Sequence, residues 1–218
     1  ATGAVLVVGN TVWNHNRRDQ TGIAVSYATV RKNVSYSNWA GIRSYAQSVL
    51  ELNRAYDNTT AGIVLAYNDT VRGNVTYSNE VGIQVYGNTG AVGSELANNL
   101  IYANQSDGIR IDDAARIDLV NNTIVQPTGD AVEVNGSSYI TLRNNIVSVE
   151  AGFALSVSEN SQIGFASDSN LFELIGAGRM ALWQRVPRAT LASWRAATLQ
   201  DGSSLSQNPQ FVDARGAD

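Results

Sequence analysis

Apolar and polar residues alternate in short segments along most of the chain, and these segments are separated by Gly, Asn, Asp and Ser. A representative stretch covers residues 109–111, 117–119 and 123–125, which read Ile-Arg-Ile, Ile-Asp-Leu and Thr-Ile-Val. A period of two sends alternate side chains to opposite faces, as in a β-strand. No window before residue 188 carries the i, i+3, i+4 apolar spacing of a helix. The pattern therefore predicts a series of short strands, followed by a helical segment near the end of the chain.

The strand-like segments repeat with a period of 20 to 25 residues, which is marked by an asparagine in a constant local context. The asparagines, most with an apolar residue three positions before them, are Asn10, Asn33, Asn53, Asn74, Asn99, Asn122, Asn145 and Asn170. A Gly-Ile pair follows about nine residues later, at Gly22-Ile23, Gly41-Ile42, Gly62-Ile63, Gly82-Ile83 and Gly108-Ile109. Altered forms of the pair occupy residues 131–132 and 154–155.

The repeat predicts a right-handed parallel β-helix, an all-β fold with three short strands in each of about eight coils. Leucine-rich repeats have similar periods, but they need a sustained L-x-x-L-x-L-x-x-N frame, which is absent here. An asparagine at the same turn of every coil can bond to its neighbours above and below, and it tolerates left-handed backbone. We expect the coils to cover residues 1–172, and a loop and helical cap of the same domain to cover residues 173–218.

The two ends of the predicted solenoid differ. Thr190 is the expected N-cap of a short helix in which Leu191, Trp194 and Ala197 face one way. This helix is expected to cover the last coil, whose strand edges and core would otherwise be exposed. The opposite end begins in mid-coil at residue 1. We expect an additional N-terminal domain, or self-association with a second copy of the chain, to cover it.

An aromatic column is predicted beside the asparagines, each ring three residues after its asparagine. Its members are Trp13, Tyr36, Tyr56, Tyr77 and Tyr102. The constant offset places the rings above one another in successive coils, roughly 4.8 Å apart. We interpret the column as a stacked ladder that supports the fold, rather than as a row of binding residues.

Composition narrows the classes of partner and of chemistry. The formal net charge is -4 and the pI is about 5.0, which argues against a nucleic-acid partner, because phosphate binding needs a concentrated basic face. No run of 18 apolar residues is present, so no membrane span is predicted. Cysteine is absent and His15 is the only histidine, which excludes disulfides, cysteine-based metal sites and sites with several histidines.

Over residues 1 to about 172, the repeat resembles the pectate-lyase-like superfamily of right-handed β-helix proteins. The tail, with TLASWR at 190–195 and SLSQNPQFVD at 204–213, resembles the ends of many secreted bacterial β-helix proteins. The resemblance implies a secreted or cell-surface protein of bacterial type that acts on polysaccharide at the outer face of one sheet. The Asn-Thr-Asp, Gly-Asp-Asp and Gly-His-Gly segments of polygalacturonases are absent, as is the Asp-Pro-His-Asp segment of mannuronan epimerases.

The strands that begin at Gly-Ile are expected to present such a face. They bury the isoleucine and the residue two later, so the residues between them point outward. One outward column is Ala24, Arg43, Val64, Gln84, Arg110, Glu133 and Ser156, and the other is Ser26, Tyr45, Ala66, Tyr86, Asp112, Asn135 and Ser158. Guanidinium, amide and aromatic groups suit a chain of sugars, so we assign substrate binding to Arg43, Tyr45, Gln84, Tyr86 and Asn135. A merely solvated sheet face would also be polar.

The candidate catalytic residues are Arg110, Asp112 and Glu133, which lie on neighbouring coils of this face. A pair of carboxyl groups such as Asp112 and Glu133 can act as acid and base on a glycosidic bond. The same oxygens suit calcium, so Ca²⁺ is the one cofactor considered, and no metal ligands are assigned. Asp107 and Asp130 are expected to stabilise turns through bonds to their own backbone.

The leading hypothesis is an extracellular protein that binds or processes an acidic glycan along these columns, as a lyase, hydrolase or epimerase does. A cleft between the enlarged turns at residues 13–21 and 87–93 would support an enzyme. The alternatives are a non-catalytic adhesin, structural or tailspike-like module, or a fragment that lacks its catalytic coils. A flat face with diverging side chains would support these alternatives.

Overall fold

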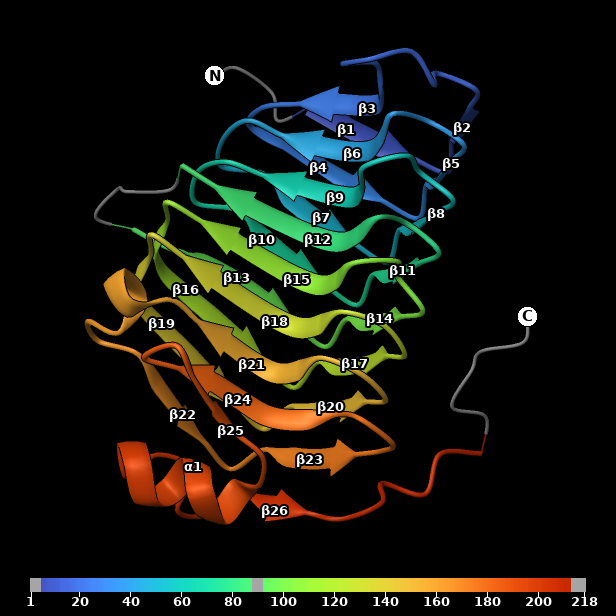
Figure 1. Ribbon diagram of the computed structural model, residues 1–218. Coiled ribbons are helices and arrows are strands. Elements are labelled where there is room, and N and C mark those ends of the chain that lie inside the picture. The colour runs from blue at the N-terminus through green and yellow to red at the C-terminus, as the bar shows by residue number, and fades with distance from the viewer. Residues whose placement is uncertain (1–4, 88–91, 213–218) are drawn as a thin grey trace.

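A computed structural model describes residues 5–87 and 92–212 of the chain. The chain winds into a parallel β-helix in which each coil contributes one strand to each of three sheets (Figure 1). The sheets run the length of the molecule, and a short helix lies at the C-terminal end. The predicted all-β solenoid of about eight coils is therefore confirmed.

The strands of each sheet follow one another along the axis, and their bounds are these. The first sheet contains β1 (Val5–Val8), β4 (Ala28–Arg31), β7 (Val49–Glu51), β10 (Thr70–Arg72), β13 (Ser94–Ala97), β16 (Ala115–Val120), β19 (Ser138–Arg143) and β22 (Ala166–Asp168). The second contains β2 (Thr11–Trp13), β5 (Val34–Tyr36), β8 (Arg54–Tyr56), β11 (Val75–Tyr77), β14 (Leu100–Tyr102), β17 (Thr123–Gln126), β20 (Ile146–Val149), β23 (Leu171–Leu174) and β26 (Leu205–Ser206). The third contains β3 (Thr21–Val25), β6 (Ala40–Ser44), β9 (Ala61–Leu65), β12 (Val81–Tyr86), β15 (Asp107–Asp112), β18 (Asp130–Asn135), β21 (Phe153–Val157), β24 (Arg179–Trp183) and β25 (Val186–Arg188).

The interior is filled by columns of aliphatic side chains, because parallel pairing places the same repeat position of each coil above the last. In the third sheet Ile83 pairs with Ile63 and Ile109, and Ile109 pairs with Val132. All four side chains are fully buried. Burial of these columns makes the register strongly specified, since a slip of one residue would turn the apolar set outward.

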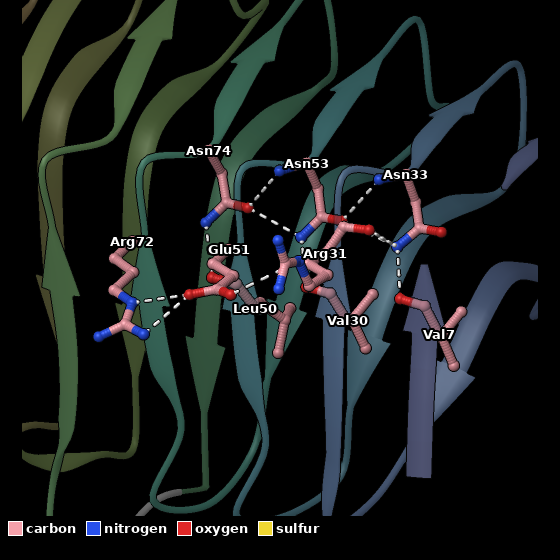
Figure 2. A network of polar contacts seen from close by, with 9 residues as sticks. All are labelled: Val7, Val30, Arg31, Asn33, Leu50, Glu51, Asn53, Arg72 and Asn74. Carbon is pink, nitrogen blue, oxygen red and sulfur yellow. Dashed lines mark hydrogen bonds and ion pairs between the residues drawn. The ribbon is translucent and has the colours of Figure 1, made fainter. Parts of the chain in front are cut away.

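The predicted asparagine ladder runs beside the first sheet, and Figure 2 shows three of its rungs. The side-chain oxygen of Asn74 accepts bonds from the backbone N–H and the amide of Asn53, both at 2.9 Å. The amide of Asn74 in turn donates to the carbonyl of Leu50 at 2.9 Å and to Asn99 Oδ1 at 3.1 Å. The same pattern continues through all eight predicted positions, from Asn10 to Asn170. Each rung thus satisfies turn groups that burial would otherwise leave unbonded.

A second asparagine ladder, which the sequence analysis missed, lies at the turn before the third sheet. Its buried rungs are Asn38, Asn58, Asn79 and Asn104. In the next coil the Gln126 amide replaces the asparagine and donates to the Asn104 carbonyl at 2.7 Å. The ladder explains the glycine of the Gly-Ile pair: a Cβ on Gly41 would lie 2.8 Å from Asn58 Nδ2 and 2.4 Å from the carbonyl oxygen of the next coil.

The aromatic column forms the predicted stack on the outer face of the second sheet. The rings of Tyr36, Tyr56, Tyr77 and Tyr102 lie parallel, with centroids 4.9 to 5.0 Å apart, and Trp13 stacks on Tyr36 at 6.0 Å. The rings therefore cover one another's faces, which supports the structural interpretation of this column.

The solenoid continues past residue 172, where the sequence analysis ended it. β24 pairs in parallel with β21 and completes the eighth coil, and β26 pairs in parallel with β23 beyond it, so the solenoid includes segments that were assigned to the cap. The predicted helix is α1 (Leu191–Thr198), which begins at Thr190 with a capping box closed by Ser193. Trp194 is fully buried beneath the last coil and donates to Asp201 Oδ2 at 2.7 Å.

At the other end, β1, β2 and β3 are the terminal strands of the three sheets. Apolar side chains such as Val5, Leu6 and Trp13 are about half exposed there. The expectation that a further domain or a second copy covers this end remains a prediction.

Candidate functional site

The outer face of the third sheet carries the two predicted columns. Parallel register places Gln84 beside Arg110, Arg110 beside Glu133, and Glu133 beside Ser156. In the neighbouring column Asp112 lies between Tyr86 and Asn135. The structure therefore brings most of the sequence-predicted site residues onto one face, in the expected order.

An apolar cluster divides this face into two parts. Val64 is only 1% exposed and packs with Ala40, Ala61 and Val81, and the rings of Trp39 and Tyr86 lie against the cluster. Tyr86, which was assigned to stacking on sugars, thus contributes to this packing.

Arg43 and Tyr45 lie on the N-terminal side of the cluster, where the guanidinium of Arg43 sits 5.9 Å from the centroid of the Tyr45 ring. Four coils separate Arg43 from Glu133, or about 19 Å. Arg43 and Tyr45 therefore lie far from the polar residues on the C-terminal side of the cluster.

Arg110 is held by two carboxylates from its own coil and the next. Its Nε donates to Glu133 Oε2 at 2.9 Å, and its Nη2 donates to Asp107 Oδ2 and, at 3.0 Å, to Ser106 Oγ. The side chains of Arg110 and Glu133 are both 27% exposed, so the network lies in a partly desolvated part of the face. Burial lowers the pKa of Arg110, but Asp107 and Glu133 outweigh it and raise that pKa above its ordinary value.

Asp112 belongs to a weaker amide network in the adjacent column. Its two oxygens accept long bonds of 3.4 Å from the side-chain amides of Gln84 and Asn135. Asp112 is therefore separated from the ion pair of Arg110 and Glu133, and each of the two carboxylates has its own partners.

Asp130 and Asp107 are site residues that the sequence analysis assigned to turns. They pair with each other in register in a third outward column, next to the Arg110 network. Asp130 Oδ1 accepts the Phe153 N–H at 2.8 Å, and Ser156 also bonds to this carboxyl. Burial raises the pKa of Asp130, despite these bonds, and the nearby charges of Asp107 and Glu133 add to the effect. The signal available in the sequence was the position of both residues directly before the Gly-Ile or Ala-Val pair.

A groove of about 490 Å³ opens at the C-terminal end of this face, over β18, β21 and β24. Its lining consists of Glu133, Asn135, Ser156, Val157, Ser158, Glu159, Asn160, Leu182 and Arg185. One wall is the short 3-10 helix η1 (Glu159–Ser161), and the other is the turn between β24 and β25, where Arg185 pairs with Glu159 at 3.0 Å. The enlarged turn at residues 13–21 does not line this groove, and of the turn at 87–93, residues 88–91 lie outside the described residues.

No group of three or more His, Asp or Glu side chains comes together as a metal site within residues 5–87 and 92–212. Calcium binding therefore stays a prediction made from residue types alone. In the same ranges, no helix is long and apolar enough to cross a membrane.

Comparison with known proteins identifies the family. The family model described as periplasmic copper-binding protein (NosD) matches residues 2–104 and again residues 66–173. The chain belongs to the NosD family. This membership agrees with the right-handed β-helix predicted from the repeat, whereas the finer resemblance to pectate-lyase-like proteins stays a prediction.

A solved structure similar to this NosD-family chain is the A-module of the mannuronan C-5 epimerase AlgE4 from Azotobacter vinelandii. The identity is 17% and the TM-score is 0.39, over 86% of this chain. The match spans 63% of the length of that module. At this level the likeness says nothing about activity. No curated protein matches the chain.

The copper binding in the family's description can be tested against the donors of this NosD-family chain. Proteins hold copper through imidazole, thiolate or thioether groups. The chain has no cysteine, one histidine (His15) and one methionine (Met180). His15 lies in the exposed turn after β2 in the first coil, and Met180 is fully buried on β24 in the last. These residues do not fit a copper site.

Proposed function

We propose that this chain binds polysaccharide in the groove over β18, β21 and β24. The observation that carries the proposal is the groove's lining: two carboxylates, two asparagine amides and two serine hydroxyls, beside the apolar side chain of Leu182. Hydroxyls, amides and carboxylates pair with sugar hydroxyls, and an apolar floor suits the C–H face of a sugar ring. Coils spaced by roughly 4.8 Å present these groups as a repeating row to an extended chain.

The compartment we propose is the periplasm or the outside of the cell. The family whose model matches most of this chain is described as periplasmic. A fold without cysteine needs no disulfide for stability, since the ladders and the core run through every coil.

Binding is the part of the function that the groove supports most strongly. The three residues assigned to catalysis are already engaged: Arg110 with Glu133, and Asp112 with two amides. Their catalytic roles stay predictions. Cleavage products are therefore measured alongside binding.

The test is affinity electrophoresis of the purified chain through a panel of soluble polysaccharides, with new reducing ends and unsaturated uronate ends measured in parallel. Ser158→Trp would fill the groove, and Glu95→Trp would add the same bulk to the exposed outer face of the first sheet. We expect retardation of the wild type and of Glu95→Trp by at least one polysaccharide, and its loss in folded Ser158→Trp. Equal retardation of both variants, or none for any polysaccharide, would refute a binding groove and favour a structural shaft.

A further inference from the structure

From the charges around the groove, we infer that it selects uncharged, hydroxyl-rich glycans and rejects uronate polymers. The inference rests on the proposed function and names the class of sugar that the groove accepts. It departs from the acidic glycan of the leading hypothesis in the sequence analysis.

The charge of Arg110 is already matched by two carboxylates, and its side chain is not among those that line the groove. Its Nε bonds to Glu133 and its Nη2 bonds to Asp107 and Ser106. Both carboxylates are part of the fold, and Asp107 is almost fully buried. Because a buried carboxylate is strongly destabilised without its cation, these pairs persist and Arg110 offers a sugar carboxylate no uncompensated charge.

The one cation of the groove's lining is paired and largely exposed to solvent. Among the described residues that line the groove, Arg185 carries the one guanidinium, and it pairs with Glu159 at 3.0 Å. Its side chain is 84% exposed, so water and salt screen its charge. Glu133 and Glu159 thus give the lining two carboxylates against one arginine.

The groove offers hydrogen-bonding groups that match the hydroxyls of a neutral sugar. The carboxylate of Glu133 accepts from a sugar hydroxyl more strongly than a neutral group does. Ser156, Ser158 and Asn160 supply groups that either donate or accept. A uronate would bring its own charge next to Glu133 and Glu159, where like charges repel and no unpaired cation of the lining compensates.

The experiment compares soluble neutral glucans and mannans with the same polymers oxidised at C6 to uronates, so that charge is the main variable. Binding is measured by isothermal titration to the wild type, to Glu133→Gln and to Glu95→Gln, which removes an exposed carboxylate from β13. We expect a neutral polymer to bind the wild type at least about ten-fold more tightly than its oxidised form. Glu133→Gln should narrow this ratio, and Glu95→Gln should leave it unchanged.

Equal or tighter binding of an oxidised polymer, abolished by Ser158→Trp, would overturn the inference and leave the groove as a binding site. Binding of neither form, or binding that Ser158→Trp does not affect, would overturn the proposed function and the inference with it. Thermal unfolding of each variant shows that lost binding is not lost folding.

Discussion

Arg110 Nε donates to Glu133 Oε2 at 2.9 Å across the boundary between two neighbouring coils of the third sheet. The same guanidinium bonds to Asp107 in its own coil. This contact links the middle of the sheet face to the groove, because Glu133 is also part of the groove's lining. The pair therefore supports the fold and sets the charge that a ligand meets.

Replacing Arg110 should show how much its ion pairs contribute to the stability of the fold. Arg110→Met keeps most of the side-chain volume but leaves Asp107 and Glu133 without their cation. Because the pair is partly exposed, we expect a loss of about 2 kcal/mol in the free energy of unfolding, less than for a fully buried pair. Arg185→Met removes an exposed pair and should cost less than about 0.5 kcal/mol. Urea unfolding of both variants checks the contrast, and equal losses would contradict this account of Arg110.

The asparagine ladder makes a second prediction. Asn74→Ala removes the acceptor of the Asn53 N–H and amide and the donor to the Leu50 carbonyl, all buried. We expect a loss of about 3 kcal/mol in unfolding free energy, since the groups left behind find no water. Asn10→Ala removes the exposed end rung of the same ladder and should cost below about 1 kcal/mol. Similar losses of unfolding free energy at the two positions would mean that the buried hydrogen bonds of the ladder do not stabilise the turns.

The pH dependence of stability should reveal the ionisation of Asp69. This carboxyl is buried between coils, where it accepts bonds from Ser44 Oγ at 2.6 Å and from the Ser48 N–H at 2.8 Å. Burial raises its pKa above the ordinary 3.8, although these bonds oppose the shift. Because its pKa is raised in the folded state, protonated Asp69 favours folding. This contribution to the free energy of unfolding is fully present below pH 3.8 and is lost as the pH rises through the folded-state pKa.

Asp69→Asn stays neutral at every pH and should escape this loss. We expect its free energy of unfolding to exceed that of the wild type by about 1 to 3 kcal/mol at pH 7, and the difference to shrink toward pH 3. Denaturant unfolding at several pH values measures it, with Glu95→Gln as an exposed carboxylate control. A difference that grows toward acid pH would have the wrong sign for this explanation.

Copper binding should be absent from this chain, despite the description of its family. After incubation with equimolar Cu(I) or Cu(II) and dialysis against a competing chelator, we expect no retained copper by elemental analysis. His15→Ala should behave as the wild type does, because one imidazole without a second donor holds copper weakly. One equivalent of copper per chain, lost in His15→Ala, would show that the donor set has been misjudged.

The fold was predictable because a solenoid places the same repeat position of every coil in one column. The spacing of Asn53, Asn74 and Asn99 therefore sufficed to place the first ladder and the three strands. The same logic would have found the second ladder, since Asn58 and Asn79 follow the first-ladder residues by five positions. That offset is as regular as the one that identified the tyrosines.

The groove was not predictable from the repeat. Its walls are η1 and the turn at Arg185, two irregular segments that lie outside the regular strand pattern of the repeat. The repeat also placed Arg110 and Glu133 on adjacent coils without revealing that they pair with each other. Side-chain pairing depends on which rotamers the neighbouring coils leave open, and a column pattern does not contain that information.

Hydrogen exchange with and without polysaccharide tests the central claim most directly. The neutral polymer that binds most tightly is added at saturation, and amide protection is mapped by mass spectrometry over the whole chain. The account predicts added protection in residues 156–161 and 182–187, which contain all of the groove's lining residues except Glu133 and Asn135, and none on the outer faces of the first and second sheets. Protection confined to another sheet, or unchanged exchange in both segments, would contradict a glycan-binding groove at this end of the β-helix.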